Sequence, residues 1–171
     1  MHGHVRRAAL ITCSLGLLLC AAGRQVSAQA QNANPFVGVW ELDRFKSVYD
    51  PITTQPERRI LTIEATAAAG EFKSTTRTWR NSVAADVSYT AKFDGAEYPT
   101  AAPQTTVSFK RVNANTVERT AKLMGQVRET ATWTLSADRK MLTITTKGTD
   151  TNDNPYSSTQ IYARTASGSG V

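Results

Sequence analysis

Beyond residue 35, apolar and polar side chains alternate along short segments that are separated by turn residues. A period of two puts successive side chains on opposite faces of a strand, so the pattern predicts β-structure rather than helix. Turn signals at intervals of about eight to twelve residues are typical of an all-β meander. We expect about nine strands, near residues 36–42, 58–65, 71–79, 86–93, 105–112, 116–123, 126–135, 140–147 and 156–164.

The residues between these segments are those that turns favour. Glycine, asparagine and aspartate recur there, at Gly70, Asn81, Asp94-Gly95, 113–115, Met124-Gly125, Asp138 and 150–155. Asp94-Gly95 is among the stronger short-range signals for a hairpin. Residues 43–56 contain Pro51 and Pro56 and are expected to cross irregularly from the first strand to the second. An up-and-down meander of this kind can protect its edges by closing into a barrel or by packing as a sandwich.

The first residues are predicted to be a targeting segment and not part of this fold. Arg6 and Arg7 precede an apolar run at 8–22 that is too short for a membrane span, and small residues follow it. We therefore expect a signal peptide at 1–28, a polar lead-in at 29–35, a barrel at 36–165 and a disordered tail at 166–171. The protein would then be periplasmic or secreted, without a stable membrane insertion.

Removal of the signal peptide changes the chemistry that is available. Both cysteines (Cys13 and Cys20) and both histidines (His2 and His4) lie within it. The remaining chain cannot form disulfides, thiol nucleophiles, Ser-His-Asp triads or the usual zinc sites. We expect no cofactor and no metal, and we assign no catalytic residue.

The charge of the exported chain is modest. Without Arg6, Arg7 and Arg24, 17 of the 20 basic residues remain against 14 acidic ones, which gives a net charge of +3. The basic pairs at 58–59, 110–111 and 139–140 are scattered and do not form a stripe. A nucleic-acid surface is therefore not expected, and we expect a monomer.

The segment from Asp150 to Asn154 begins like a calcium loop. Pro155, however, stands where glycine is needed, and Ile161 stands where the last glutamate would be. We interpret residues 150–155 as a hairpin turn.

Three features together go beyond alternation: Gly38-x-Trp40 at the start, the run of hairpins, and the closing strand at 160–164. In these, and in the runs 89–95 and 146–150, the chain resembles small bacterial secreted lipocalin-like proteins of the calycin superfamily. The resemblance implies an all-β fold with a single up-and-down antiparallel barrel of 8–10 strands. It also implies structural roles for three residues. Gly38 lets the first strand bend, Trp40 closes one end of the barrel, and Arg164 covers the Trp40 ring.

More distantly, the last strand is similar to that of fatty-acid-binding proteins, in which an Arg-x-Tyr pair holds the ligand carboxylate. Tyr162 keeps the tyrosine, but Gln160 stands where the arginine would be. This departure argues against carboxylate capture by that pair.

Alternation puts two charged residues on apolar faces. Arg119 shares its face with Val117, Ala121 and Leu123, and Glu129 shares the next one with Ala131 and Trp133. With a three-residue loop at 123–125, Arg119 and Glu129 become direct cross-strand partners, which a buried arginine needs. They form either a polar anchor in a cavity or a structural ion pair; in a slipped register both lie at a solvated rim.

The same alternation gives an aromatic interior with a few polar groups, which suits a small, largely apolar ligand. The residues that we expect to bind it are Tyr89, Phe109, Arg119, Glu129, Trp133, Gln160 and Tyr162. Two alternatives remain open. One is an isomerase- or cyclase-like enzyme that works in the cavity through Glu129, a tyrosine or a lysine. The other is a barrel filled by its own side chains that acts as an envelope interaction protein.

Overall fold

The structure is a computed structural model that describes residues 34–165. The expected signal peptide, most of the lead-in and the tail at 166–171 lie outside the described residues. The elements are the 3-10 helix η2 (Ile52–Thr54) and the strands β1 (Gly38–Leu42), β2 (Val48–Asp50), β3 (Arg58–Ala65), β4 (Glu71–Arg80), β5 (Val83–Lys92), β6 (Asp94–Pro99), β7 (Thr105–Asn113), β8 (Thr116–Leu123), β9 (Gln126–Leu135), β10 (Met141–Thr149) and β11 (Pro155–Thr165).

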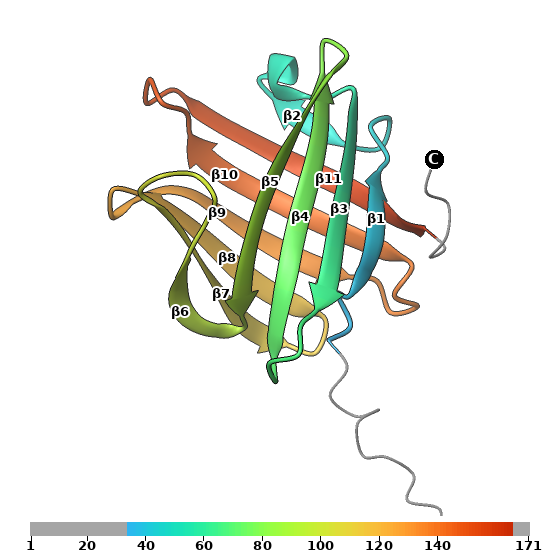
Figure 1. Cartoon of the computed structure of the whole chain (residues 1–171). Helices are drawn as coiled ribbons and strands as arrows, with labels where there is room; N and C mark the ends of the chain where they lie inside the picture. The colour runs from blue at the N-terminus through green and yellow to red at the C-terminus, as the bar shows by residue number, and fades with distance from the viewer. Residues whose placement is uncertain (1–33, 166–171) are drawn as a thin grey trace, which may run out of the picture. The chain divides into compact units, whose positions relative to one another are not determined.

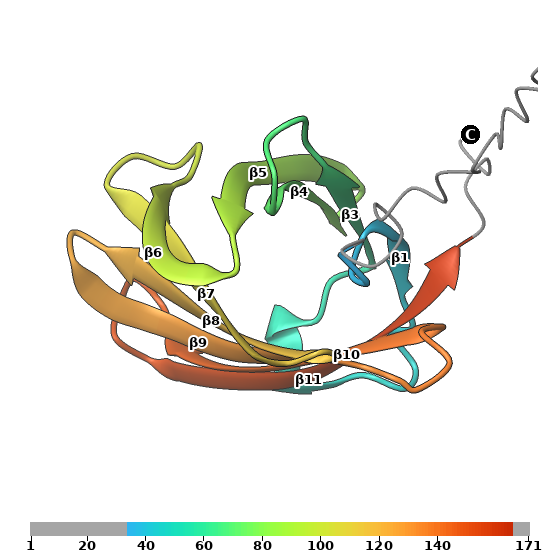
Figure 2. The same ribbon diagram turned by 90° about the horizontal axis from the view of Figure 1, so that it is seen from below.

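These strands form one antiparallel sheet that curls almost into a closed barrel (Figures 1 and 2). Its order is β5-β4-β3-β1-β11-β10-β9-β8-β7-β6, and β2 pairs with β11 off this path. The ends of the sheet meet where β5 approaches β6. They are joined there by one isolated bridge between Tyr89 and Thr100, which includes a 3.3 Å hydrogen bond from the amide of Ala101 to the carbonyl of Ser88. The predicted all-β, up-and-down barrel is confirmed, and the sandwich is excluded.

Two strands lie where none was expected. β2 falls within 43–56, and its middle residue, Tyr49, is buried against the sheet. β6 begins at Asp94, which was expected to belong to a hairpin turn. The chain does reverse there, but β6 forms its ladder with β7, and the bridge to β5 is made by Thr100, the residue after β6. The hairpin turn at 150–155 is confirmed between β10 and β11.

One end of the barrel is filled by aromatic side chains. This aromatic cluster consists of Phe36, Phe72, Phe93, Phe109 and Trp133. The rings of Phe72 and Phe93 stack at 4.5 Å between centroids, and Phe109 meets Trp133 edge to face at 5.3 Å. Such pairs add to the free energy of burial, so this end of the barrel is a packed core.

The predicted contact between Arg164 and Trp40 is confirmed beside this cluster. Arg164 Cζ lies 4.0 Å from the centroid of the Trp40 ring, and the two residues are cross-strand partners in β11 and β1. The guanidinium also donates to the carbonyl of Pro35 at 2.8 Å and to that of Val37. Gly38 has φ +148°, and a Cβ there would overlap Arg164 Nη1. The glycine therefore makes room for the arginine, as well as for the bend.

Candidate functional site

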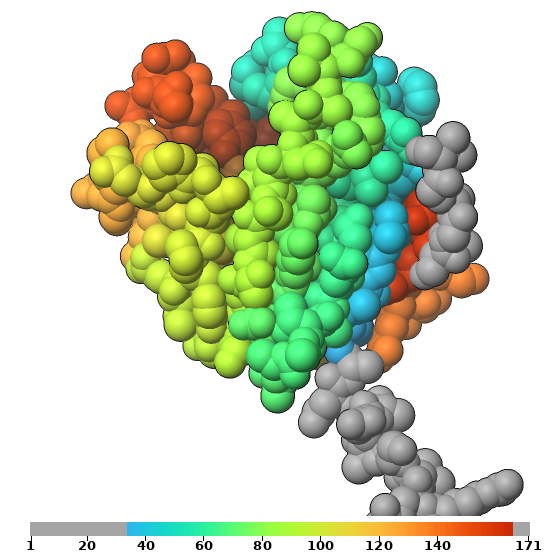
Figure 3. Space-filling view, viewed as in Figure 1, coloured from blue at the N-terminus to red at the C-terminus, as the bar shows by residue number. Residues whose placement is uncertain are grey.

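Two adjoining cavities occupy the other end of the barrel, where Figure 3 shows a recess between the β4–β5 and β10–β11 hairpins. The inner chamber, of about 290 Å³, is lined by Arg59, Leu61, Thr76, Thr78, Val87, Tyr89, Arg119, Glu129, Trp133, Ile144, Thr146, Gln160 and Tyr162. The outer chamber, of about 280 Å³, is lined by Tyr49, Thr54, Arg59, Arg80, Glu129, Thr146, Asp150, Tyr156, Ser158 and Gln160. Four residues border both chambers: Arg59, Glu129, Thr146 and Gln160.

Six of the seven residues that were expected to bind a ligand surround the inner chamber. Phe109 is the exception, because it is fully buried in the aromatic cluster. The structure brings the six together, while their part in binding stays a prediction.

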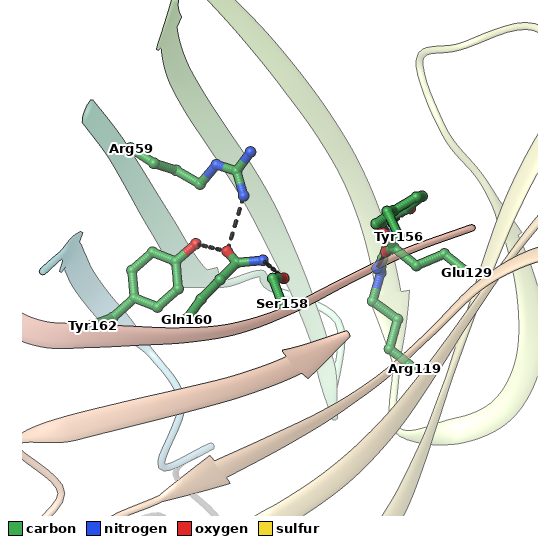
Figure 4. A network of polar contacts seen from close by, with 7 residues as sticks. All are labelled: Arg59, Arg119, Glu129, Tyr156, Ser158, Gln160 and Tyr162. Carbon is green, nitrogen blue, oxygen red and sulfur yellow. Dashed lines mark hydrogen bonds and ion pairs between the residues drawn. The ribbon is translucent and has the colours of Figure 1, made fainter. Parts of the chain in front are cut away.

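Arg119 and Glu129 form the ion pair that was expected, and Tyr156 completes it (Figure 4). Arg119 Nη1 donates to Glu129 Oε1, and the Tyr156 hydroxyl donates to Glu129 Oε2 at 2.5 Å. The two charged side chains are only 19% and 22% exposed. Both carboxylate oxygens are therefore engaged within the barrel wall.

The register behind this pair differs from the prediction. Met124 and Gly125 form a two-residue turn with φ of 52° and 78°, and the ladder then shifts between Ala121 and Lys122. As a result, Arg119 lies opposite Ala131 and reaches Glu129 diagonally across the strands. The expected direct pairing was wrong, because a two-residue turn followed by a bulge replaces the three-residue loop.

The ion pair fixes the protonation states on this wall. Burial disfavours the charged form of Glu129, but Arg119 and the Tyr156 hydrogen bond hold the pKa of its carboxyl below the usual value. Burial and the neighbouring carboxylate together raise the pKa of Tyr156. Near neutral pH, Glu129 is therefore an anion and Tyr156 a neutral donor.

A second polar network centres on Arg59 of β3 and shares strand β11 with the first (Figure 4). Arg59 Nη1 donates to Gln160 Oε1 at 2.9 Å, and the Tyr162 hydroxyl donates to the same oxygen at 2.6 Å. Arg59 Nε also donates to Thr78 Oγ1 at 3.1 Å. Burial raises the pKa of Tyr162 to about 12, although the charge of Arg59 opposes this, so Tyr162 stays protonated.

Arg59 is the important residue that the sequence interpretation missed. It shares its inward face of β3 with Leu61 and Ile63, both of which are buried. The alternation that identified Arg119 gives the same signal here. Arg59 thus brings a positive charge from β3 to Gln160.

Three buried polar atoms at these chambers have no hydrogen-bond partner among the described residues: Tyr49 Oη, Arg119 Nε and Trp133 Nε1. The two nitrogens can only donate, and the hydroxyl can donate as well. Buried polar groups are rarely left unpaired. These three donors therefore favour a bound molecule that accepts hydrogen bonds.

Within residues 34–165, no group of three or more acidic, cysteine or histidine side chains could hold a metal ion. The same residues include no helix that is long and apolar enough to cross a membrane.

No protein-family model matches the chain, and no curated protein does. Among solved structures, it is similar to the zebrafish ileal bile acid-binding protein in complex with cholic acid, with 10% identity and a TM-score of 0.45 over 77% of this chain and 99% of that one. It is also similar to the siderocalin Ex-FABP, with 9% identity and a TM-score of 0.38 over 77% of this chain and 71% of that one.

Proposed function

We propose that this protein binds a small, largely apolar molecule in the inner chamber, with access through the outer one. The observation that carries the proposal is the unequal filling of the barrel. One end is packed with aromatic rings, whereas the other keeps two chambers bordered by Leu61, Ile144 and Trp133 as well as by polar groups. A concave site that combines apolar walls with convergent polar groups is the usual form of a small-molecule site.

The state of Glu129 supports a binding role over acid–base catalysis. A general base works best when its pKa lies near the operating pH. Both carboxylate oxygens of Glu129 already accept hydrogen bonds, and its pKa is lowered. The chambers also support binding over the filled barrel, since the side chains leave about 290 Å³ and 280 Å³ unoccupied.

Titration with Nile red, a neutral dye that fluoresces in apolar surroundings, tests the proposal. We expect saturable binding to the wild type and a loss of at least tenfold in affinity for Thr146→Phe, because Thr146 borders both chambers and is buried. Thr145→Phe is the matched control, since Thr145 is the exposed neighbour on the outer face of β10. Absence of saturable binding to the folded wild type, or equal loss in both variants, would contradict the proposal.

We further propose that the protein is exported to the periplasm or secreted as a monomer, after removal of residues 1–28. The basic start at Arg6-Arg7, the apolar run at 8–22 and the small residues before Gln29 support this. The intact mass of the secreted form should correspond to a start at Gln29 or Gln31. A lipid-modified Cys20 would contradict the proposal.

A further inference from the structure

We propose, on the basis of the binding function above, that the ligand is an anionic amphiphile whose charged group lies in the outer chamber between Arg59, Arg80 and Tyr49. The charged group would be a carboxylate, sulfate or phosphate, and the apolar body would occupy the inner chamber.

The outer chamber has more positive than negative charge that is free of an ion pair. Glu129 is the acid nearest the interior, and Arg119 neutralises it. Asp150 accepts hydrogen bonds from the amides of Asn152 and Asn154 within its own turn. Among residues 34–165, no carboxylate lies within 4.0 Å of the guanidinium of Arg59 or Arg80. Arg59 and Arg80 therefore face this chamber without an ion-pair partner among the described residues, and with Asp150 counted against them one positive charge is in excess.

The outer chamber also offers more free hydrogen-bond donors than free acceptors. Arg59 uses Nε and Nη1, and Arg80 uses Nη1 to donate to the carbonyl of Thr54 at 2.8 Å. The described residues provide no hydrogen-bond partner for the buried Tyr49 hydroxyl at the same chamber. The strongest acceptors are already occupied, since both oxygens of Glu129 accept and Gln160 Oε1 accepts twice. Such a chamber favours a group that only accepts.

An anion meets both requirements, and an amine meets neither. Guanidinium groups offer several N–H donors in one plane, which match the oxygens of a carboxylate, sulfate or phosphate. The positive field also acts on the protein itself, because Arg59 and Arg80 both oppose the rise that burial causes in the pKa of Tyr49.

The arrangement of the chambers sets the direction of the ligand. The inner chamber ends at Trp133 and contains Leu61 and Ile144, whereas the outer chamber borders the turn residue Asp150 and the exposed Arg80. The apolar body therefore enters first, and the charged group stays near solvent. Its desolvation cost is then smaller than it would be at the closed end.

Competition against Nile red with ligands that share one apolar body tests the inference. We expect octanoate and octyl sulfate to displace the dye from the wild type at concentrations at least tenfold lower than octanol does, and octylamine to be weakest. Arg59→Met and Arg80→Met should each weaken octanoate at least tenfold more than octanol. Tyr49→Phe, which keeps the ring, should weaken octanoate by about threefold through loss of one donor. Arg77→Met is the matched control, because Arg77 is an exposed residue of β4 that pairs with Asp86 instead of bordering a chamber.

Each outcome decides between the two proposals. If octanoate, octanol and octylamine displace the dye equally, the chamber does not select anions, although the binding function stands. If Arg77→Met reduces the preference as much as Arg59→Met does, the selectivity comes from overall charge and the inference is wrong. If Nile red does not bind to the folded wild type and no octyl ligand binds by calorimetry, the binding function itself fails.

Discussion

At the scale of single residues, Glu129 holds the polar wall of the inner chamber together. Arg119 and Tyr156 each donate to one of its carboxylate oxygens, so its charge is satisfied on two sides. A carboxylate away from bulk water remains ionised only while such donors are present. The charge of Glu129 and the position of Arg119 therefore depend on each other.

A double-mutant cycle measures this dependence. Arg119→Met and Glu129→Gln should each lower the free energy of unfolding, because each leaves its partner without a counter-charge. The double variant should lose less than the sum, with a coupling of about 0.5–3 kcal/mol in urea denaturation. Arg77→Met with Asp86→Asn, an exposed pair with 56% and 53% of the side chains exposed, is the control and should show little coupling. Additive effects at Arg119 and Glu129 would mean that the pair contributes nothing.

The lowered pKa of Glu129 also makes stability depend on pH. Since the folded state holds the pKa below that of the unfolded chain, the contribution is complete above about pH 4.3, the ordinary value for glutamate. It is lost as the pH falls from there through the folded pKa. The difference in unfolding free energy between wild type and Glu129→Gln should shrink over that range. A difference that stays constant from pH 7 to pH 3 would contradict the lowered pKa.

Strand alternation predicts the inward charged residues Arg119 and Glu129, whereas Gln160 and Tyr162 were predicted from the resemblance of the last strand. Arg119, Glu129, Gln160 and Tyr162 do face the interior at one chamber. Arg59 alternates with apolar residues in the same way, but it follows a second arginine, Arg58, and such a charged pair is typical of an exposed surface. Its partnership with Gln160 spans a sequence separation of 101 residues, which local patterns do not reveal. Phe109 was correctly predicted to be internal, yet alternation cannot tell a packed interior from an open one.

At the scale of elements, β1 depends on one glycine. Gly38→Ala should lower the free energy of unfolding by about 1–3 kcal/mol through backbone strain, with a further loss because the new Cβ overlaps Arg164. Gly95→Ala is the matched control, since Gly95 also has positive φ but nothing lies within 4 Å of a Cβ there. Chemical denaturation should show a larger loss for Gly38→Ala. Equal losses would mean that Arg164 adjusts without cost.

The turn between β8 and β9 offers a substitution that should stabilise the protein. Met124 has φ 52°, is 69% exposed and precedes Gly125, as the first residue of a two-residue hairpin loop. Asparagine tolerates this conformation better than methionine does, so Met124→Asn should raise the free energy of unfolding by about 0.5–1 kcal/mol. Met124→Val should lower it, because β-branched residues disfavour positive φ. A gain for valine over asparagine in denaturant titration would contradict the turn.

The strands with long, regular alternation were predictable within a few residues. β2 was not, because three residues beside Pro51 carry too little pattern, and its strand state comes from pairing with β11. The β8–β9 register was missed for a related reason. The sequence indicates a turn at Met124-Gly125 but not the bulge behind it, which leaves Val127 54% exposed.

At the scale of the whole molecule, the environment raises the pKa of all five tyrosines, which are Tyr49, Tyr89, Tyr98, Tyr156 and Tyr162. Burial is the main cause in four of them, and a hydrogen bond to Asp94 is the main cause for Tyr98. Raised values mean that stability is complete below about pH 10, the ordinary tyrosine pKa, and falls as the pH rises above it. Absorbance at 295 nm should show ionisation together with alkaline unfolding. Reversible ionisation near pH 10 in the folded protein would contradict this.

The near-closure of the barrel between β5 and β6 has a mechanical consequence. Every pair of neighbours in the sheet order is joined by a ladder, whereas this boundary has one isolated bridge, to which the hydrogen bond from Ala101 to Ser88 belongs. At about 0.5–1.5 kcal/mol net for each hydrogen bond, parting the two strands costs far less than parting any other pair. Stacking of Phe93 on Phe72 anchors the chain just after β5, so the wall is stiff at that end and compliant toward the chambers. The barrel can therefore open between β5 and β6. Its diameter at the chambers can adjust to a bound molecule, while the end filled by the aromatic cluster keeps its shape.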